Sequence, residues 1–307
     1  YCDYEQRPKT NQNSVSIGRN LDGCRIGFDA GGSDRKVSAV IDGEPVFSEE
    51  TVWNPKITSD PSYHYEGILD SFRKAAAHMP RVDAIGVSSA GIYVDNQTKV
   101  ASLFLKVSDD DFQKTIKNIY INAAKAIGPD IPIVVANDGD VTALAGAMSL
   151  QKNGVLGIAM GTSEAGGYVD PAGKITGWLN EFAFTPVDLS PKATMDEWSG
   201  DIGCGVKYFS QDGVIKLCHA AGINLPENAT PAEKLKVVQA LMEQKDPKAA
   251  EIFETIGVWL GYTMKLYRIF YDADEVLLLG RVVSGEGGNI ILNKTKEVLS
   301  TEYPTLK

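Results

Sequence analysis

The stretch that decides the fold is Ile26-Gly27-Phe28-Asp29-Ala30-Gly31-Gly32-Ser33, in which an apolar, strand-like run ends in a glycine turn. Two similar turns follow: Gly161-Thr162-Ser163 after the apolar run 155–160, and Gly280 after the run 276–279. Glycine lets backbone N–H groups approach phosphate oxygens closely, and a Ser or Thr hydroxyl adds a further donor. One Gly-Gly turn alone is typical of a hairpin, so the order and spacing of all three turns favour a nucleotide-phosphate site.

A carboxylate stands where another strand meets a helix. The apolar run 133–136 leads directly into Asn137-Asp138, and the residues after it have helical spacing. Position alone favours Asp138 or Asp140 as a helix cap. The other interpretation is that Asp138 accepts a hydroxyl proton during phosphoryl transfer. We expect the helix dipole to keep Asp138 ionised.

The composition is typical of a globular protein, and the net charge limits the kinds of partner that we expect. The chain has 307 residues, of which 43% are hydrophobic, and a formal net charge of -10. This length favours about two domains. We find no basic stripe of the kind that binds nucleic acid or anionic membranes, so neither is expected as a partner. The expected polyanion is a nucleotide held locally.

The sequence shows no targeting or disulfide pattern. No apolar run approaches the roughly 20 residues of a membrane span, and residues 1–20 have no signal-peptide core, so we expect a cytoplasmic protein. Cys2, Cys24, Cys204 and Cys218 are irregularly spaced with no Cys-x-x-Cys pair. This spacing favours reduced thiols over a disulfide framework or a zinc site.

Hydrophobic periodicity predicts two α/β halves. In the first half we expect strands at 25–29, 36–41, 45–50, 82–88 and 132–136, with helices at 63–79, 110–127 and 139–151. In the second half we expect strands at 154–160, 165–170, 174–177 and 275–279, with helices at 194–221, 231–244, 247–270 and 288–300. The second half begins like the first and is predicted to repeat it. Gly257 and Gly261 are predicted to permit close helix packing.

These motifs resemble the actin/hexokinase/Hsp70 superfamily and, within it, the ROK family of bacterial sugar kinases and regulators. The first turn is similar to the family's Asp-x-Gly-Gly-Thr motif, with Ser33 replacing Thr. The resemblance continues through residues 84–91, 137–146, 160–167 and 277–280, and so covers almost all of residues 25–300. It implies a two-domain ribonuclease H-like (actin-like ATPase) fold in which each half is a mixed sheet flanked by helices.

The resemblance also implies domain boundaries. They are a polar N-terminal extension (1–24), an N-terminal actin-like domain (25–138) and a C-terminal actin-like domain with a helical insertion (139–307). ATP and Mg²⁺ are the implied cofactors, with Asp29 holding Mg²⁺ through a water molecule. Asp138 is the implied catalytic base. The implied substrate residues are Asn137 and Glu181, and the implied nucleotide residues are Asp29, Gly31, Gly32, Ser33, Gly161, Thr162 and Gly280.

The chain departs from the family pattern on the acceptor side. Glu181-Phe182-Ala183-Phe184 replaces the Glu-x-Gly-His segment, and Gly203-Cys204-Gly205-Val206 is all that remains of the zinc motif, so no zinc is expected. Glu181 is either a substrate residue or a surface glutamate. Residues 101–105 lack the Asn that the family offers to the sugar. At the adenosine motif, Arg281 follows Gly280 in place of a second glycine, where it either contacts the nucleotide or obstructs the base.

Together, these observations predict an ATP-dependent phosphotransferase acting on a hydroxyl of a sugar or sugar-like substrate. The alternative is a noncatalytic ROK-like ligand-binding or regulatory protein without a DNA-binding domain, because residues 1–24 are too short and polar for a helix-turn-helix. A reductase-activating ATPase is disfavoured, since Cys204 alone does not supply a bridging iron–sulfur cluster. The expected partners are the nucleotide, the small-molecule substrate and a second copy of the chain.

Overall fold

The computed structural model describes residues 3–7, 14, 16 and 18–306, which form two compact units. The N-terminal unit comprises residues 18–142. The C-terminal unit comprises residues 143–306 together with the described residues up to 16. The boundary falls within helix α4 (Asp138–Leu150), and the predicted division after residue 138 lies at the first residue of this helix. Cys2 lies outside the described residues.

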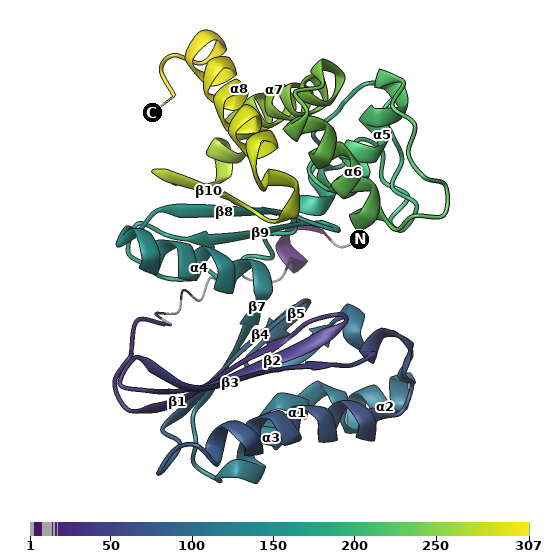
Figure 1. Cartoon of the computed structure of the whole chain (residues 1–307). Helices are drawn as coiled ribbons and strands as arrows, with labels where there is room; N and C mark the ends of the chain where they lie inside the picture. The colour runs from purple at the N-terminus through teal and green to yellow at the C-terminus, as the bar shows by residue number, and fades with distance from the viewer. Residues whose placement is uncertain (1–2, 8–13, 15, 17, 307) are drawn as a thin grey trace. The chain divides into compact units, whose positions relative to one another are not determined.

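The N-terminal unit is built on a five-stranded mixed sheet (Figure 1). Its order is β3-β2-β1-β4-β7, in which β1 pairs antiparallel with β2 and parallel with β4, and β4 pairs parallel with β7. All five predicted strands are confirmed. Their bounds are β1 (Cys24–Ala30), β2 (Asp34–Ile41), β3 (Glu44–Val52), β4 (Ala84–Ser89) and β7 (Ile133–Asn137).

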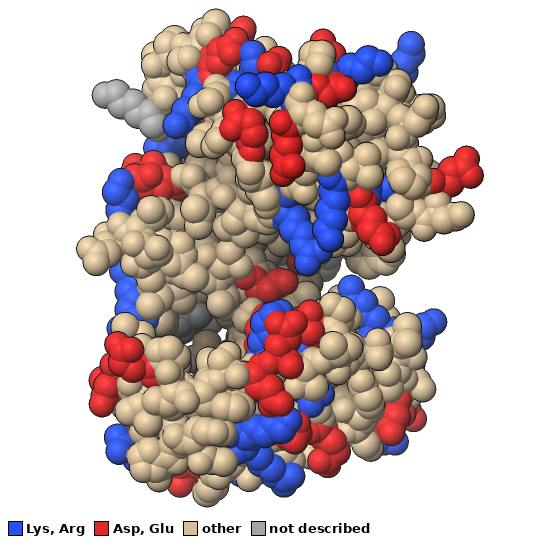
Figure 2. Space-filling view, in the orientation of Figure 1, with Lys and Arg blue, Asp and Glu red and all other residues tan. Residues whose placement is uncertain are grey.

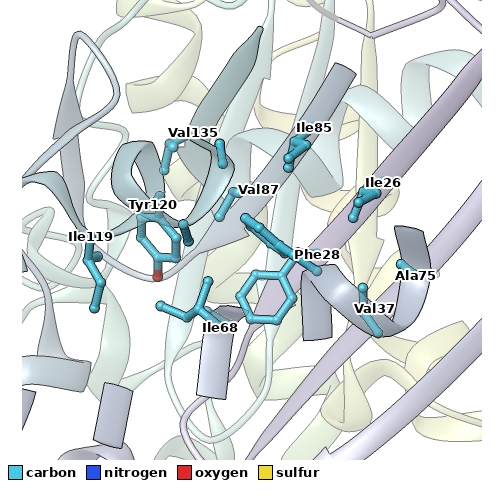
Figure 3. Packing of buried hydrophobic residues seen from close by; sticks show 14 of the residues in the cluster. Ile26, Phe28, Val37, Ile68, Ala75, Ile85, Val87, Ile119, Tyr120 and Val135 are labelled. Atoms are coloured by element: carbon cyan, nitrogen blue, oxygen red, sulfur yellow. The ribbon is translucent and has the colours of Figure 1, made fainter. Parts of the chain in front are cut away.

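Alternation along β1 separates a core face from a polar face. Ile26 and Phe28 are buried with side chains of helices α1 (Pro61–Ala76) and α3 (Ile119–Ile127) (Figure 3). Because successive side chains of a strand point to opposite faces, Asp29 lies on the other face of the sheet. The rings of Phe28 and Phe72 meet edge to face, with centroids 5.4 Å apart. This packing fixes the strand that carries the first glycine turn.

Two features of the N-terminal unit differ from the predictions. The predicted helix 110–127 is divided into α2 (Asp109–Lys114) and α3 by a 3₁₀ turn at Ile116–Asn118. An unpredicted hairpin, β5 (Ile92–Val94) and β6 (Gln97–Val100), turns at two residues with positive φ. One of them, Asn96, bonds the backbone of β7 with its side chain, donating to the Ile133 carbonyl at 3.0 Å and accepting from the Val135 N–H at 2.9 Å.

The C-terminal unit has a three-stranded sheet ordered β10-β8-β9, from β8 (Val155–Met160), β9 (Glu164–Val169) and β10 (Glu275–Leu279). β8 pairs antiparallel with β9 and parallel with β10, as β1 does with β2 and β4. The predicted strand 174–177 is wrong. Ile175 makes only an isolated bridge with Val169, and Gly177 then has a positive φ of 71°, which interrupts the extended backbone.

Four long helices complete the C-terminal unit: α5 (Gln211–Ala221), α6 (Pro231–Glu243), α7 (Pro247–Phe270) and α8 (Glu286–Glu302). The close packing predicted at Gly257 and Gly261 is confirmed. A methyl group at Gly257 would lie 2.7 Å from the Ile291 carbonyl oxygen, and one at Gly261 would lie 2.6 Å from Val298 Cβ. Both contacts are with α8, so the two glycines bring α7 and α8 together.

The predicted helix 194–221 is wrong over its first part, since α5 begins only at Gln211. Gly200 and Gly203 have positive φ values of 78° and 73°. The Asp196 carboxylate also accepts the Ser199 N–H at 2.8 Å, a local bond that competes with a helical one. Residues 194–204 therefore form an irregular loop.

On the face drawn in Figure 2, acidic and basic side chains are interspersed and neither sign forms a continuous stripe. None of the described helices combines the length and apolar character that a membrane span requires.

Candidate functional site

The carboxyl ends of β1, β4 and β7 lie at one edge of the N-terminal sheet, because these three strands are parallel and adjacent. Asp29 lies near the end of β1, Asn137 ends β7, and Asp138 begins α4. The structure thus brings together Asp29, Asn137 and Asp138 and the turn of Gly31, Gly32 and Ser33 that follows β1. Open α/β sheets usually bind ligands at this edge.

Asp138 is half-buried and its carboxylate accepts the Gly139 N–H at 3.0 Å. Burial raises the pKa of Asp138, the negative charge of Asp29 adds to the rise, and the N–H bonds at the helix start oppose it. Desolvation has a larger effect on this pKa than the N–H bonds at the helix start, and the ionised state of Asp138 stays a prediction. A raised pKa makes the carboxylate a better proton acceptor.

Asn137 has two structural bonds. Its side-chain amide donates to the Gly91 carbonyl at 3.0 Å, and its oxygen accepts the Gly139 N–H at 2.8 Å. Gly91 has a φ of 136°, and a side chain there would overlap the Val100 carbonyl, so this turn requires glycine. Asn137 therefore fixes the strand-to-helix junction that carries Asp138.

A buried polar chain that the sequence analysis did not identify lies beside this junction. The Tyr93 hydroxyl donates to Ser89 Oγ at 2.7 Å, and Ser89 Oγ lies 3.0 Å from the Tyr120 hydroxyl. Burial raises the pKa of Tyr120 to about 12 and raises the pKa of Tyr93 well above its ordinary value, and nearby Asp138 contributes to the shift at Tyr93. Both phenols stay protonated, so they form an uncharged hydrogen-bonded chain with Ser89 beside the junction.

The first glycine turn is held by Trp53, which comes from the end of β3. The indole N–H donates to the Gly31 carbonyl at 2.8 Å, and the Trp53 backbone N–H donates to the Ser33 carbonyl at 3.1 Å. Carbonyl and amide point in opposite directions in a trans peptide, and no described peptide is cis. The Gly32 N–H is therefore directed away from Trp53, and Gly32 itself is exposed.

The two basic residues that follow this turn, Arg35 and Lys36, both form ion pairs with carboxylates. Arg35 is bound to Asp70 at 3.1 Å and to Ser71 at 3.0 Å. Lys36 pairs with Asp34, and this ion pair lowers the pKa of the Asp34 carboxyl. The Ser33 hydroxyl also donates to Asp34, at 3.2 Å. Neither Arg35 nor Lys36 is left free for a ligand by these contacts.

The second glycine turn, in the C-terminal unit, closes on itself. The Gly161 N–H donates to the Ser163 carbonyl at 3.0 Å, and the Gly161 carbonyl accepts the Gln211 N–H at 2.9 Å. A methyl group at Gly161 would meet nothing nearer than 3.7 Å. Packing within the unit therefore does not require glycine here, whereas close approach of a ligand to the backbone would. Thr162 is exposed.

Gly280 follows β10 and lies beside the end of β8. Its φ is 99°, and a side chain there would overlap the Met160 carbonyl, so the backbone itself requires this glycine. The structure brings Gly161, Thr162 and Gly280 to one edge of the sheet, at the carboxyl ends of two parallel strands. Arg281 is exposed at the start of a 3₁₀ turn, and its carbonyl accepts from Gln239 at 2.9 Å.

Glu181 is exposed and precedes the 3₁₀ turn Phe182–Phe184. Phe182 is a core residue, stacked on Tyr267 with ring centroids 4.5 Å apart. Phe104 is likewise buried in the core of the N-terminal unit. Phe184 is half-buried and lies 5.5 Å from the ring of Trp198.

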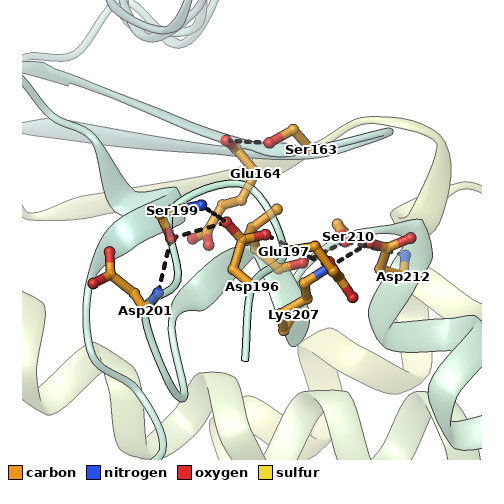
Figure 4. Close-up of polar contacts among 10 residues, drawn as sticks. Ser163, Glu164, Asp196, Glu197, Ser199, Asp201, Lys207, Ser210 and Asp212 are labelled. Carbon is orange, nitrogen blue, oxygen red and sulfur yellow. Dashed lines mark hydrogen bonds and ion pairs between the residues drawn. The ribbon is translucent and has the colours of Figure 1, made fainter. Parts of the chain in front are cut away.

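The irregular segment after Glu181 is held by a charged cluster around Lys207 (Figure 4). The Lys207 ammonium group contacts Asp196 at 3.5 Å, Asp212 at 3.0 Å and also Glu197. The Lys207 and Asp196 side chains are only 8% and 9% exposed. This cluster joins the loop 194–204 to the first turn of α5.

Glu164 is a buried carboxylic acid directly after the second glycine turn. One carboxyl oxygen lies 3.2 Å from the Tyr267 hydroxyl, and the other is buried without a hydrogen bond to any described residue. Burial raises the pKa of Glu164 to about 8. Nothing in the local sequence indicated this, because a single Glu in a strand ordinarily faces solvent.

The residues present fit a magnesium nucleotide. Among the described residues, no three His, Cys, Asp or Glu side chains are grouped to hold a metal. Mg²⁺ in phosphoryl-transfer sites usually uses one or two carboxylates together with substrate phosphates, and Asp29 supplies one. The exposed N–H of Gly32 and the open backbone at Gly161 suit phosphate oxygens.

No protein-family model matches the sequence, and no curated protein matches it. Solved structures of ROK proteins do share the fold. A ROK family glucokinase from Streptomyces griseus, in complex with glucose and AMPPNP, aligns over 90% of this chain and 88% of its own, with a TM-score of 0.62 and 21% identity. The ROK hexokinase from Thermus thermophilus aligns over 90% and 89%, with a TM-score of 0.65 and 17% identity.

A ROK family transcriptional regulator, a homologue of the E. coli Mlc protein, aligns over 91% of this chain and 70% of its own, with a TM-score of 0.72 and 18% identity. At these identities the similarity shows the fold. The chain therefore has the actin-like α/β fold that ROK sugar kinases and ROK regulators share, as the sequence predicted.

Proposed function

We propose that this chain is a ROK-family, ATP-dependent kinase that phosphorylates a hydroxyl of a sugar or sugar-like substrate. The observation that carries the proposal is the position of Asp138: it is half-buried, at a helix start, at the same sheet edge as Asp29 and the first glycine turn. The fold shared with ROK glucokinase and hexokinase supports the same conclusion.

In this mechanism Asp138 accepts the proton of the acceptor hydroxyl. The hydroxyl oxygen bonds to the γ-phosphorus, the bond from the γ-phosphorus to the β,γ-bridging oxygen breaks, and ADP leaves. Asn137 fixes the junction that orients Asp138. The residues that we propose for nucleotide binding are Gly31, Gly32 and Ser33 in the N-terminal unit and Gly161, Thr162 and Gly280 in the C-terminal unit. Asp29 would hold Mg²⁺ through water, and Mg²⁺ neutralises phosphate charge when it is bound.

Asp138→Asn tests the catalytic assignment. After sugars have been screened for ADP release, we expect this variant to lower turnover roughly 10²- to 10⁴-fold, because the amide cannot take the proton. Mg-ATP affinity, measured by calorimetry, should be retained. Asp140→Asn is the matched control, since Asp140 lies in the same helical turn. Near-normal turnover of Asp138→Asn, or an equal loss in Asp140→Asn at equal thermal stability, would contradict the assignment.

The second candidate is a noncatalytic ligand-binding or regulatory protein of the same fold. The similarity to the ROK regulator favours it, as does Arg281 at the adenosine turn. This candidate predicts that calorimetry detects no Mg-ATP binding, whereas the kinase requires it. A sugar that binds without nucleotide and without ADP release would support the regulator.

A further inference from the structure

Lys56 lies against the first glycine turn, although it comes 23 positions after Ser33 in the sequence. A methyl group at Gly32 would lie 2.8 Å from Lys56 Cε and 3.0 Å from Lys56 Nζ. The ammonium group therefore stands beside the backbone that a phosphate would approach. Lys56 is exposed, and no ion pair or hydrogen bond of its side chain is found among the described residues.

The backbone that carries Lys56 is fixed. Lys56 is the middle residue of the 3₁₀ turn Pro55–Ile57, directly after the buried Trp53. The Asn54 N–H donates to the Tyr63 hydroxyl at 2.9 Å, and the Thr58 hydroxyl donates to the Asn54 carbonyl at 2.7 Å. Trp53 thus anchors the glycine turn, and it also anchors the segment that places the Lys56 side chain beside Gly32.

The charges around the turn favour phosphate binding by the unpaired Lys56 ammonium group. Asp29 and Asp34 are both acidic, and a phosphate group would add negative charge beside them. Arg35 and Lys36 are already bound to Asp70 and Asp34. An incoming phosphate therefore needs a cation that is not paired, and Lys56 supplies one in the right place.

We propose that Lys56 binds the phosphates of the nucleotide at the first glycine turn. The side chain needs only to rotate about its flexible stem to reach an oxygen next to the Gly32 N–H. The proposal rests on the proposed kinase function for the identity of the nucleotide, but it also applies to any polyphosphate bound at this turn. Sequence did not indicate Lys56, because it follows no recognised motif.

Calorimetric titration of Lys56→Gln with Mg-ATP, Mg-ADP, adenosine and inorganic tripolyphosphate tests the proposal. We expect Mg-ATP and tripolyphosphate to bind roughly tenfold more weakly than to the wild type, Mg-ADP to be affected less, and adenosine not to be affected. The dependence of affinity on salt should also weaken, because one ionic contact is lost. Lys125→Gln, at an exposed position in α3, is the control and should bind all four ligands as the wild type does.

Wild-type affinity for Mg-ATP and tripolyphosphate in Lys56→Gln would overturn the role of Lys56 and leave the kinase proposal intact. An equal loss of adenosine affinity would also overturn it, because the variant would then have damaged the whole site. Tripolyphosphate binding that depends on Lys56, in a protein that phosphorylates no sugar, would support Lys56 and contradict the kinase. Absence of binding by the wild type to every phosphate ligand would overturn both.

Discussion

The two units share a strand arrangement but support their glycine turns in different ways. In the N-terminal unit, Trp53 ties the turn to β3 through two hydrogen bonds. In the C-terminal unit, the turn bonds to itself and to the first residue of α5. The long segment that leads to α5 has little regular structure and is held by Lys207 and its three carboxylates.

This difference shows that a repeated backbone arrangement does not require repeated side-chain support. The five-stranded sheet of the N-terminal unit fixes its carboxylates through regular pairing and a large apolar core. The C-terminal unit has three strands and a large apolar core of its own, and it also buries two charged or titratable groups, Lys207 and Glu164. Variants at these groups and at Trp53 therefore separate the two kinds of support.

The largest effect is expected from Lys207→Met. This change removes the cation beside the buried Asp196 carboxylate and should lower the free energy of unfolding of the C-terminal unit by about 3 kcal/mol. Hydrogen exchange should show lost protection across residues 185–212 and unchanged protection in β1, β4 and β7. Lys294→Met, which removes only an exposed pair with Glu297, is the control and should change far less. Equal effects of the two variants would show that the cluster is not a structural support.

A smaller effect is expected from Trp53→Phe, which acts on the N-terminal unit. Loss of the indole N–H and of ring volume should lower stability by about 2 kcal/mol, measured by urea denaturation, and should speed exchange of the Gly32 amide. Trp259→Phe, in α7 of the other unit, is the matched control and should leave that amide unchanged. Unaltered exchange at Gly32 in Trp53→Phe would mean that the turn is stable without Trp53.

Compared over a single pH unit, the smallest effect is the pH dependence at Glu164. Its folded pKa of about 8 lies above the ordinary 4.5, so the folded state keeps a proton that the unfolded chain releases between these values. Stability should therefore fall as pH rises through this window, by at most about 1.4 kcal/mol per pH unit, and level off above it. Glu164→Gln keeps the Tyr267 contact and should remove this fall. Thermal melting of both proteins from pH 5 to 9 measures the difference, and parallel curves would contradict the assignment.

The sequence by itself determined the strands that end in glycine turns, most of the helices and the position of Asp138. These features depend on local patterns: alternation along 25–29, glycine after an apolar run, and apolar spacing over 247–270. The same kind of pattern wrongly predicted a helix over 194–210. Gly200 and Gly203 have positive φ there, and the Asp196 side chain forms local hydrogen bonds that compete with helical ones.

Only the tertiary structure decided which side chains support the site. Trp53 and Lys56 reach the first turn because β3 pairs with β2 and brings residues 53–56 back beside Gly31 and Gly32. The raised pKa values of Glu164 and Asp138 depend on what packs around each carboxylate. Desolvation and long-range contacts are properties of the folded chain, so no pattern of neighbouring residues contains them.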